Sequence, residues 1–313
     1  MSTTNLTAFE WEAIIQGIHD SQCVLCIGPG IYSLNAEQPN YSKQLESYLR
    51  KHQEELRIHV QDNGWFHLQS GGSYGPAYQA IRAFYQDIPE NSREVLQKLA
   101  QLKSHLILSL NPDYHLRDAF EAQQFPHRFD AYVRNQPDRN TQSPTAEVPL
   151  IYNILGELNV RNSLVLTFDD FYDYLESVFK GNSMSSMLKN NILDAQYFLF
   201  IGIPFDQWFV HLFLRIIRQH KERRTRFAAG RQLTKEELES CSAQYNIRFI
   251  NTGITDFVDE LYQRCEAKTL IKTPRSVDEV RQEDNLFEQL ENWISQNEIK
   301  RCINRLKEVL RGV

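Results

Sequence analysis

The chain has 313 residues, of which 42% are hydrophobic and 24% charged, a profile typical of a folded protein with one large domain and a small one. Its net charge of −6 argues against a general attraction to nucleic acid or anionic lipid. No apolar run approaches the roughly 18–20 residues of a membrane span, and the N-terminus has no basic region ahead of a hydrophobic stretch. We therefore expect a cytoplasmic protein with no membrane segment and no nucleic-acid partner.

Five cysteines are scattered along the chain, at positions Cys23, Cys26, Cys241, Cys265 and Cys302. The first two have the spacing of a metal-binding pair, but they lie inside an apolar run typical of a strand, and no second pair matches them. A strand also directs residues three apart to opposite faces. We therefore expect buried free thiols in a reducing compartment, and no metal site.

The N-terminal part of the chain predicts one strand followed by a helical insertion. An amphipathic pattern predicts a helix over Thr7–His19. The apolar run Cys23–Ile27 follows and ends at Gly28-Pro29-Gly30, as a buried parallel strand does when it enters a tight turn. Residues 38–102 are predicted to be mostly helical, with a Gly-rich turn at residues 70–73.

Further short apolar runs alternate with helical patterns. The predicted strands are His105–Ser109, Leu150–Ile154, Leu164–Thr167, Tyr197–Ile201, Arg226–Ala229 and Arg248–Asn251. The predicted helices are Asp169–Phe179, Asp206–Arg218, Thr234–Tyr245 and Thr255–Cys265. Residues 122–149 contain four prolines and indicate a loop-rich stretch. This alternation predicts an α/β fold with a doubly wound parallel sheet that helices cover on both faces.

The C-terminal residues indicate a separate segment. Residues 1–267 are predicted to form the main domain, residues 268–276 a linker, and residues 277–313 a helical pair. Its first helix, Val277–Gln296, is acidic and its second, Glu298–Leu310, is basic. Two interpretations stay open: an antiparallel hairpin docked on the main domain, or a small adaptor that pairs with similar modules through opposite charge.

Small and polar residues follow four of the predicted strands. In an open parallel sheet, ligands bind outside the carboxyl ends of the strands. The candidate binding residues are Gly28, Gly30, Ser33, Asn111, Asp113, Gly156, Gly202 and Asp206. Glycines after a first strand let the backbone approach a pyrophosphate, and an amide such as that of Asn111 can hold a ribose hydroxyl. Plain turns would show the same glycines, and Asp113 or Asp206 would equally serve as helix caps.

Taken in order, these segments resemble the sirtuin-like family of Rossmann-type proteins, and among its members the bacterial branch of antiphage and other conflict systems. The most specific stretch is Ser163–Tyr172, followed by Phe200–Asp206. The resemblance covers residues 8–265. The C-terminal pair is similar to the small effector-associated, death-like adaptors of those systems.

The resemblance implies binding of NAD. Active members of the family cleave the bond between nicotinamide and ribose, with an asparagine near the ribose and a histidine that acts as a base on its hydroxyls. Asn111 matches the asparagine, but Leu155 stands where the histidine is expected, just before Gly156. A leucine side chain cannot accept a proton, so this role is empty.

Other departures from the family pattern point the same way. Pro29 replaces the residue between the two glycines and removes a backbone N–H of the kind that such loops direct at phosphates. Pro112 replaces an aromatic residue. His115 and His127 are the alternative bases, although a lone histidine is more often a surface or packing residue. The family's zinc ribbon is absent, as in branches that are not deacylases.

Three hypotheses follow. The first is a pseudo-enzyme that acts as a scaffold or nucleotide sensor in a bacterial defence system, in which residues 277–313 join a second copy or a partner with a similar module. The alternative is an active NAD hydrolase with a different base, switched on by assembly. A nucleic-acid partner depends only on the basic stretch of residues 218–231, and cations at a helix end are the commoner explanation of that stretch.

Overall fold

The computed structural model describes residues 5–34, 39–61, 65–134, 136, 142–161, 163–165, 167–179, 184–207, 210–211, 213–214, 225–230, 241–273, 293, 301 and 303. The chain divides into two compact units, Met1–Lys272 and Thr273–Val313. All the elements below belong to the first unit. The predicted C-terminal helices lie outside the described residues, apart from Trp293, Arg301 and Ile303.

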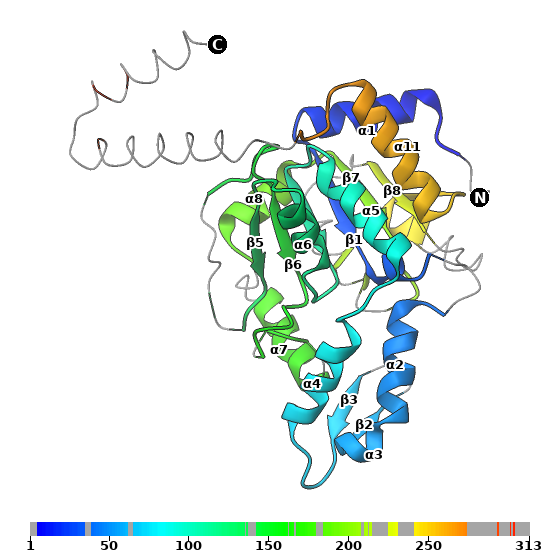
Figure 1. Ribbon diagram of the computed structural model, residues 1–313, viewed down its shortest axis with the longest axis vertical. Helices are drawn as coiled ribbons and strands as arrows, with labels where there is room; N and C mark the ends of the chain where they lie inside the picture. The colour runs from blue at the N-terminus through cyan, green and yellow to red at the C-terminus, as the bar shows by residue number, and fades with distance from the viewer. Residues whose placement is uncertain are drawn as a thin grey trace. The chain divides into compact units, whose positions relative to one another are not determined.

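A seven-stranded sheet forms the centre of the first unit (Figure 1). Its strand order is β5-β6-β4-β1-β7-β8-β9, and every neighbouring pair is parallel. The strands are β1 (Cys23–Ile27), β4 (Leu106–Ser109), β5 (Arg128–Ala131), β6 (Leu150–Asn153), β7 (Tyr197–Ile201), β8 (Thr225–Ala229) and β9 (Ile247–Ile250). The chain adds strands first on one side of β1 and then on the other, so the predicted doubly wound α/β fold is confirmed.

Helices pack on both faces of this sheet. Leu25 and Ile27 of β1 belong to one core, with residues of α1 (Ala8–His19), α5 (Glu90–Gln101), α6 (His115–Ala122) and α11 (Ile254–Ala267). Val24 and Cys26 belong to a second core, with residues of α7 (Phe168–Phe179) and α8 (Ser186–Asp194). Cys23 and Cys26 are buried free thiols in different cores, as their alternation along a strand predicts.

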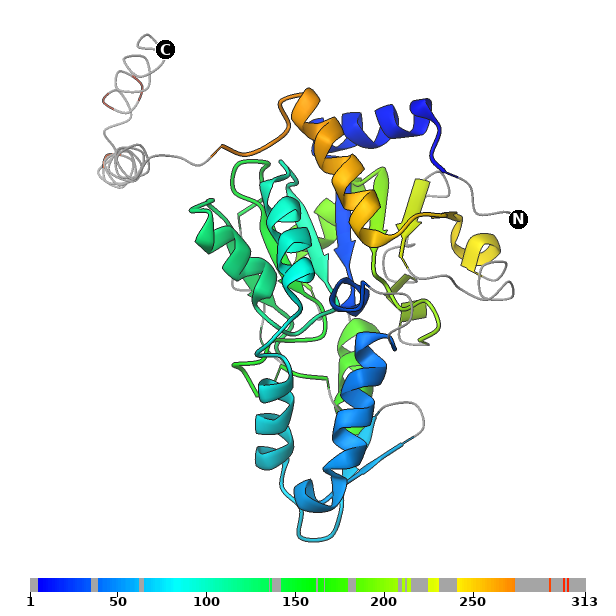
Figure 2. The same cartoon turned by 45° about the vertical axis from the view of Figure 1, so that its right-hand side comes forward.

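A small module extends from the edge at which the strands end (Figures 1 and 2). It consists of α2 (Tyr41–Lys51), α3 (Gln53–Leu56), the antiparallel hairpin of β2 (Ile58–Val60) and β3 (Phe66–Leu68), and α4 (Tyr74–Phe84). The prediction of a mostly helical insertion missed this hairpin. Strands of three residues are too short to display a clear two-residue alternation.

Two further predictions about strands were wrong. β5 lies inside the stretch expected to be a loop, at the edge of the sheet, where Arg128 and Phe129 are partly exposed and Asp130 and Ala131 are buried. The predicted strand Leu164–Thr167 does not join the sheet, and Thr167 forms only an isolated bridge to Phe66. Leu164 and Val165 are apolar because they are buried in the two cores, not because they form a strand. Helix α8 was not predicted.

Two predicted helices lie largely outside the described residues. Of Asp206–Arg218 the structure describes a turn at residues 205–206 and helical residues 210, 211, 213 and 214, and of Thr234–Tyr245 it describes helical residues 241–245. Of the basic stretch, residues 225–230 are described, and Arg226 is buried with its guanidinium on the carbonyl oxygen of Tyr245, at 2.7 Å. None of the helices among the described residues is long and apolar enough to cross a membrane.

The start of the predicted linker packs on the first unit. Leu270 and Lys272 are buried, and backbone hydrogen bonds join Lys103 N to Leu270 O at 3.0 Å and Lys272 N to Gln101 O at 2.7 Å. Residues 268–272 therefore act as a strap across the C-terminal end of α5. The division into a main domain and an adaptor stays a prediction.

Candidate functional site

The ends of the four central strands are level with one another. Ile27 is in register with both Ser109 and Ile201, and Ser109 is in register with Asn153. The prediction that these four strands end on one side of the sheet is confirmed. The loops that carry the candidate residues therefore start from a common edge, which faces the small module.

The glycine loops after β1 and β7 pack backbone against backbone. Gly28 N donates to Ile201 O at 2.9 Å, and Gly30 N donates to Gly202 O at 2.8 Å. A Cβ atom on Gly28 would lie 2.5 Å from Gly202 O, and one on Gly30 would lie 2.7 Å from Gly202 Cα. Gly202 itself has a φ of +67°. These glycines are needed for the contact between the two loops.

This packing occupies the amides that a phosphate would need. Besides the two bonds above, Ile31 N donates to Gly28 O at 3.3 Å, and Pro29 has no N–H. A loop that cradles a pyrophosphate directs several free N–H groups at it. The amides of residues 28, 30 and 31 are directed at protein carbonyl groups instead, so this arrangement does not fit a pyrophosphate.

Asn111 lies on the other side of the same edge, beside a cavity. Its backbone N–H donates a hydrogen bond to Ser109 Oγ at 3.0 Å. The residue is 3% exposed, and its Oδ1 is buried with no hydrogen-bond partner among the residues that the structure describes. A buried acceptor left unpaired costs about 1–3 kcal/mol, so such an atom marks a place where a donor would fit.

The cavity beside Asn111 has a volume of about 140 Å³. Residues from the strand ends and from the small module line it: Pro29, Ser42, Lys43, Leu45, Glu46, Leu49, Trp65, Phe66, Ile81, Tyr85, Leu110, Asn111, Pro112, Leu155, Leu164, Val165 and Gln207. We call it the Asn111 cavity. Its wall is largely apolar, and Leu155 is the residue after β6 that contributes to it.

Gly156, the neighbour of Leu155, is explained by packing. It has a φ of +92°, and a Cβ atom there would lie 2.0 Å from Ser163 O. The hydroxyl of Ser163 accepts a hydrogen bond from Glu157 N at 2.9 Å and fixes the loop on this side. The glycine therefore allows the segment after β6 to turn tightly against residue 163, and it does not line the Asn111 cavity.

Asp113 is committed to protein partners. Its two carboxylate oxygens accept the hydroxyl of Tyr32 at 2.8 and 2.9 Å, and Oδ1 also accepts His115 N at 3.0 Å. Both side chains are buried, and burial raises the pKa of Asp113 and that of Tyr32. Asp113 thus joins the loop after β1 to the start of α6, whose N-cap residue is Tyr114.

The two alternative histidines do not line the Asn111 cavity. His115 Nε2 contacts Tyr85 O at 2.6 Å, and its ring packs edge-on against Tyr32. His127 Nδ1 contacts Phe125 O at 3.0 Å, and its ring lies 5.4 Å from that of Phe120. Both have structural partners in the first unit.

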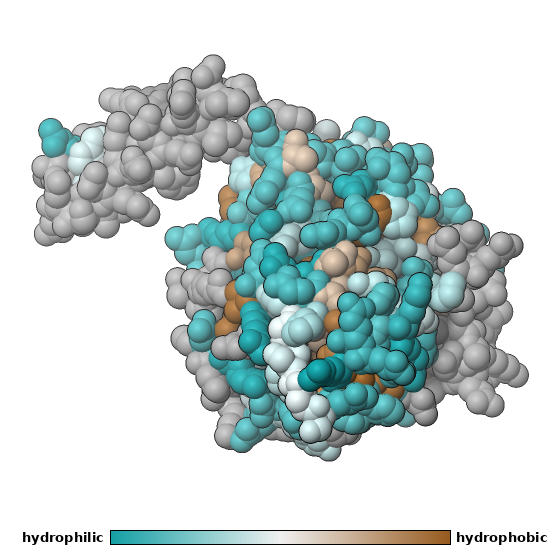
Figure 3. Space-filling view, turned by 60° about the horizontal axis from the view of Figure 1, so that its bottom comes forward, coloured by the Kyte–Doolittle hydropathy of each residue, from teal (hydrophilic) through white to brown (hydrophobic). Residues whose placement is uncertain are grey.

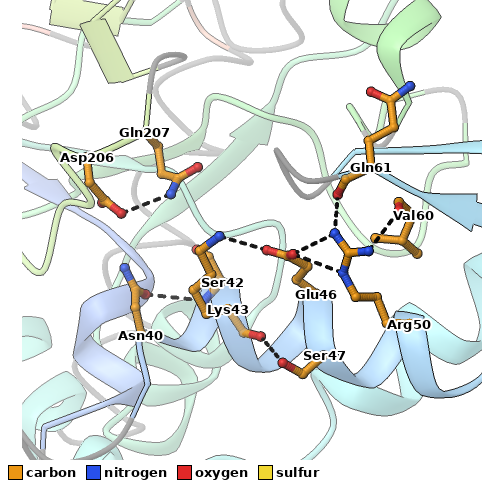
Figure 4. A network of polar contacts seen from close by, with 10 residues as sticks. All are labelled: Asn40, Ser42, Lys43, Glu46, Ser47, Arg50, Val60, Gln61, Asp206 and Gln207. Atoms are coloured by element: carbon orange, nitrogen blue, oxygen red, sulfur yellow. Dashed lines mark hydrogen bonds and ion pairs between the residues drawn. The ribbon is translucent and has the colours of Figure 1, made fainter.

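Ser33 and Asp206 also lie away from the cavity wall. Ser33 Oγ accepts Gln44 Nε2 at 3.1 Å. Asp206 is exposed and accepts Gln207 Nε2 at 3.0 Å, while Gln207 itself reaches the cavity (Figure 4). Of the predicted residues, only Asn111 and Leu155 line the cavity, and the three glycines 28, 30 and 202 form the closed loop contact next to it.

An ion network on α2 forms the rim of the cavity (Figure 4). Glu46 Oε1 accepts Arg50 Nε and Nη2 at 3.1 and 3.0 Å, and Glu46 Oε2 accepts Lys43 Nζ at 2.9 Å. Arg50 also donates to the carbonyl oxygens of Val60 and Gln61, at 3.1 and 2.7 Å. The sequence shows the helical spacing of these charges, but that spacing is common on exposed helices, so nothing in it indicated a place at the cavity.

A second cavity of about 250 Å³ lies next to the first and shares Phe66 and Leu164 with it. Its other lining residues are Tyr74, Tyr78, Arg134, Arg161, Asp169 and Asp170. Arg134 pairs with Asp170 at 2.7 Å and with Asp173 at 2.9 Å. These ion pairs join the loop after β5 to the start of α7, which gives Arg134 and Asp170 a structural role.

The chain was compared with known proteins. The family model of the SIR2-like domain matches residues 105–250. A solved structure of a Sir2 variant with a deacetylated p53 peptide and 3′-O-acetyl ADP ribose is similar at 12% identity and a TM-score of 0.40, covering 83% of this chain and 99% of that one. A second solved structure, titled as the structural basis for the mechanism and regulation of Sir2 enzymes, is similar at 11% identity and a TM-score of 0.38. The match covers 83% of this chain and 99% of that one. No curated protein matches the chain.

The matched region holds the part of the sheet on which the candidate site depends. It begins at the residue before β4 and ends with β9, so it contains both residues of the prediction that line the cavity, Asn111 and Leu155. It leaves out β1 and the first glycine loop. Residues 105–250 are thus similar to a SIR2-like domain.

Proposed function

We propose that this chain is a SIR2-like pseudo-enzyme, which keeps the fold of an NAD-binding protein but does not cleave NAD. The observation that carries the proposal is the wall of the Asn111 cavity, where Leu155 occupies the place of the expected base. No histidine among the described residues lines that cavity. A general base must lie within hydrogen-bond reach of the proton that it removes.

The ionisable residues of the cavity wall do not replace the base. Both oxygens of Glu46 are engaged, by Lys43 and by Arg50. Lys43 is the cationic partner in that pair. Burial raises the pKa of Tyr85 well above its ordinary value, so its hydroxyl stays protonated at neutral pH. The wall therefore offers binding contacts but no group suited to accept a proton.

The fit to NAD is partial. Asn111 Oδ1 fits a hydroxyl or amide donor of a ligand. The loop amides do not fit a pyrophosphate. The Asn111 cavity has a volume of about 140 Å³, and the cavity of about 250 Å³ that shares Phe66 and Leu164 with it adjoins it. The closed loop amides favour a scaffold over a sensor of the intact dinucleotide. The role in bacterial antiphage defence, and assembly with a second copy or a related partner through residues 277–313, belong to the same proposal.

Incubation of the full chain with NAD, followed by chromatography of released nicotinamide, tests the proposal. We expect no release above a blank without protein. Release that disappears in Asn111→Ala would overturn it and would favour the alternative, an NAD hydrolase with a different base that assembly switches on. The unpaired Asn111 Oδ1 is the observation that supports this alternative. The assay is therefore repeated at high protein concentration, which favours the proposed assembly.

Removal of the C-terminal segment tests the assembly. Because Leu270 and Lys272 are buried against the first unit, the shortened chain ends at Thr273. We expect it to stay folded and to lose self-association in light scattering, with an effect of salt on the mass of the full chain. Equal masses for the two chains at all salt concentrations would refute a homo-oligomer held by this segment.

A further inference from the structure

The hairpin of the small module carries two histidines in direct opposition. His59 of β2 is in register with His67 of β3. Their neighbours Ile58, Val60 and Phe66 are buried and face the module's interior, whereas both histidines are exposed. Residues alternate between the two faces of a strand, so the pair lies on the outer face of the hairpin.

The ring nitrogens of this pair are free of hydrogen bonds to any residue that the structure describes. Four other histidines contact polar groups, whereas the buried Nδ1 of His105 has no partner among the described residues. His19 contacts the carboxylate of Asp20, and His52 contacts the carbonyl oxygen of Tyr48. His59 and His67 touch each other instead, with ring centroids 5.0 Å apart and an angle of 49° between the ring planes.

This separation suits two imidazoles that share one metal ion. A nitrogen lies about 2.0–2.1 Å from a bound zinc ion, and a ring centroid lies about 3.2 Å from it. Two such rings at coordination angles of about 90–109° have centroids roughly 4.5–5.2 Å apart. The observed 5.0 Å falls within this interval. The two rings therefore lie at a separation that is compatible with binding one metal ion.

We propose that His59 and His67 bind one divalent transition-metal ion, of the class of Zn²⁺, Ni²⁺ or Cu²⁺, which imidazole ligands suit. No group of three or more His, Cys, Asp or Glu residues able to hold a metal gathers among the described residues. Of the residues that the structure describes, the hairpin thus supplies these two ligands, and other ligands, such as water or a group from another molecule, complete the coordination.

The site has a structural consequence. A two-stranded hairpin is marginally stable by itself, and each strand here has three residues. A metal bound across the strands fixes their register and stabilises the folded state by mass action. In Figure 3, which brings the small module's end of the molecule forward, hydrophilic residues cover most of the surface in view, a setting in which a hydrated ion can approach.

Titration of the full, untagged chain with Zn²⁺ and with Ni²⁺ by isothermal calorimetry tests the proposal. We expect one site per chain, with affinity reduced at least about tenfold in His59→Asn and in His67→Asn, since even second-shell changes cost about 10–100-fold. His19→Asn is the matched control, an exposed histidine outside the hairpin, and it should bind as the unaltered chain does.

Circular dichroism of each variant shows whether the fold is retained, and the thermal midpoint should rise with Zn²⁺ in the unaltered chain but not in His59→Asn. Absence of saturable binding to the unaltered chain would overturn the proposal. So would equal binding by the chain in which both histidines are replaced. Neither result bears on NAD, so the metal site and the proposed function are tested independently.

Discussion

The two halves of the strand-end edge differ in how their polar groups are used. At the contact between the loops after β1 and β7, the amides of Gly28 and Gly30 donate to carbonyl oxygens of residues 201 and 202. At the Asn111 cavity, a side-chain oxygen is buried without a partner. One half is closed by the protein itself, and the other keeps an acceptor for a ligand. The same strand-end edge therefore closes two loops on each other and keeps a pocket beside them.

Substitutions at the contact between the loops after β1 and β7 should lower the stability of the fold most. In Gly202→Ala the new Cβ atom would lie 2.7 Å from Ile31 N and 2.9 Å from Gly30 C, at a φ of +67°. We expect the free energy of unfolding to fall by roughly 3 kcal/mol or more, from backbone strain together with displacement of the loop. Urea denaturation measures it.

Gly75→Ala is the control for this substitution. Its Cβ atom would meet only Ser73 Oγ, at 3.7 Å, inside helix α4. The free energy of unfolding should change by less than about 1 kcal/mol. Equal losses in the two variants would show that the loop contact has no special role.

The strap at residues 268–272 provides a comparison away from the site. Lys272 is also buried, and its Nζ has no hydrogen-bond partner in the described part of the chain. Its Nζ lies 4.9 Å from the centroid of the Phe120 ring, and burial lowers its pKa to about 7, with Glu147 opposing and Lys103 adding to the shift. The unfolded chain keeps the ordinary pKa of about 10.4, so between these values it binds a proton that the folded chain does not.

The free energy of unfolding should therefore rise with pH between about 7 and 10 relative to Lys272→Met, by roughly 2–4 kcal/mol. Below pH 7 both states of Lys272 are charged, and the difference between the two proteins should stay constant. Lys98→Met, which removes a partly exposed partner of Asp259, should show no such slope. A parallel pH profile for Lys272→Met and the unaltered chain would contradict the burial of this amine.

At the Asn111 cavity, removal of the unpaired polar side chain should not lower the stability of the fold. Asn111→Leu removes the unpaired Oδ1, so we expect the free energy of unfolding to stay level or to rise by about 1 kcal/mol. Asn153→Leu is matched to it at the end of the neighbouring strand, where Nδ2 donates to Asp113 O at 2.9 Å. That variant should lose about 1–3 kcal/mol. If both variants lose stability alike, Asn111 has a structural partner and the contrast between the halves fails.

The central strands were the most predictable part of the molecule. The bounds of β1 and β7 agree with the apolar runs Cys23–Ile27 and Tyr197–Ile201, because strands buried on both faces are continuous apolar runs and glycine follows each of them. The run Leu164–Thr167 is equally apolar but is buried outside the sheet. A run of this length indicates burial, and only the tertiary structure distinguishes a strand from a buried loop.

The site residues also divide into those that the sequence could predict and those that it could not. Asn111 and Leu155 follow strands directly, so their place at the edge could be predicted. Tyr32, Glu46 and Trp65 could not, because they reach the site through contacts between segments far apart in the sequence. The roles expected of Ser33, Asp113, Gly156 and Asp206 rested on residue type, and in the structure these residues contact other protein groups or solvent.

Binding of NAD to the full chain, measured by calorimetry beside hydrogen exchange of the amides of Gly28, Gly30 and Ile31, tests most directly whether the closed half still holds a pyrophosphate. Because these amides donate to Ile201 O, Gly202 O and Gly28 O, we expect no saturable binding of NAD and no change in their exchange. Saturable binding together with slower exchange at these three amides would contradict the account, because it would show that the loops open to receive the dinucleotide.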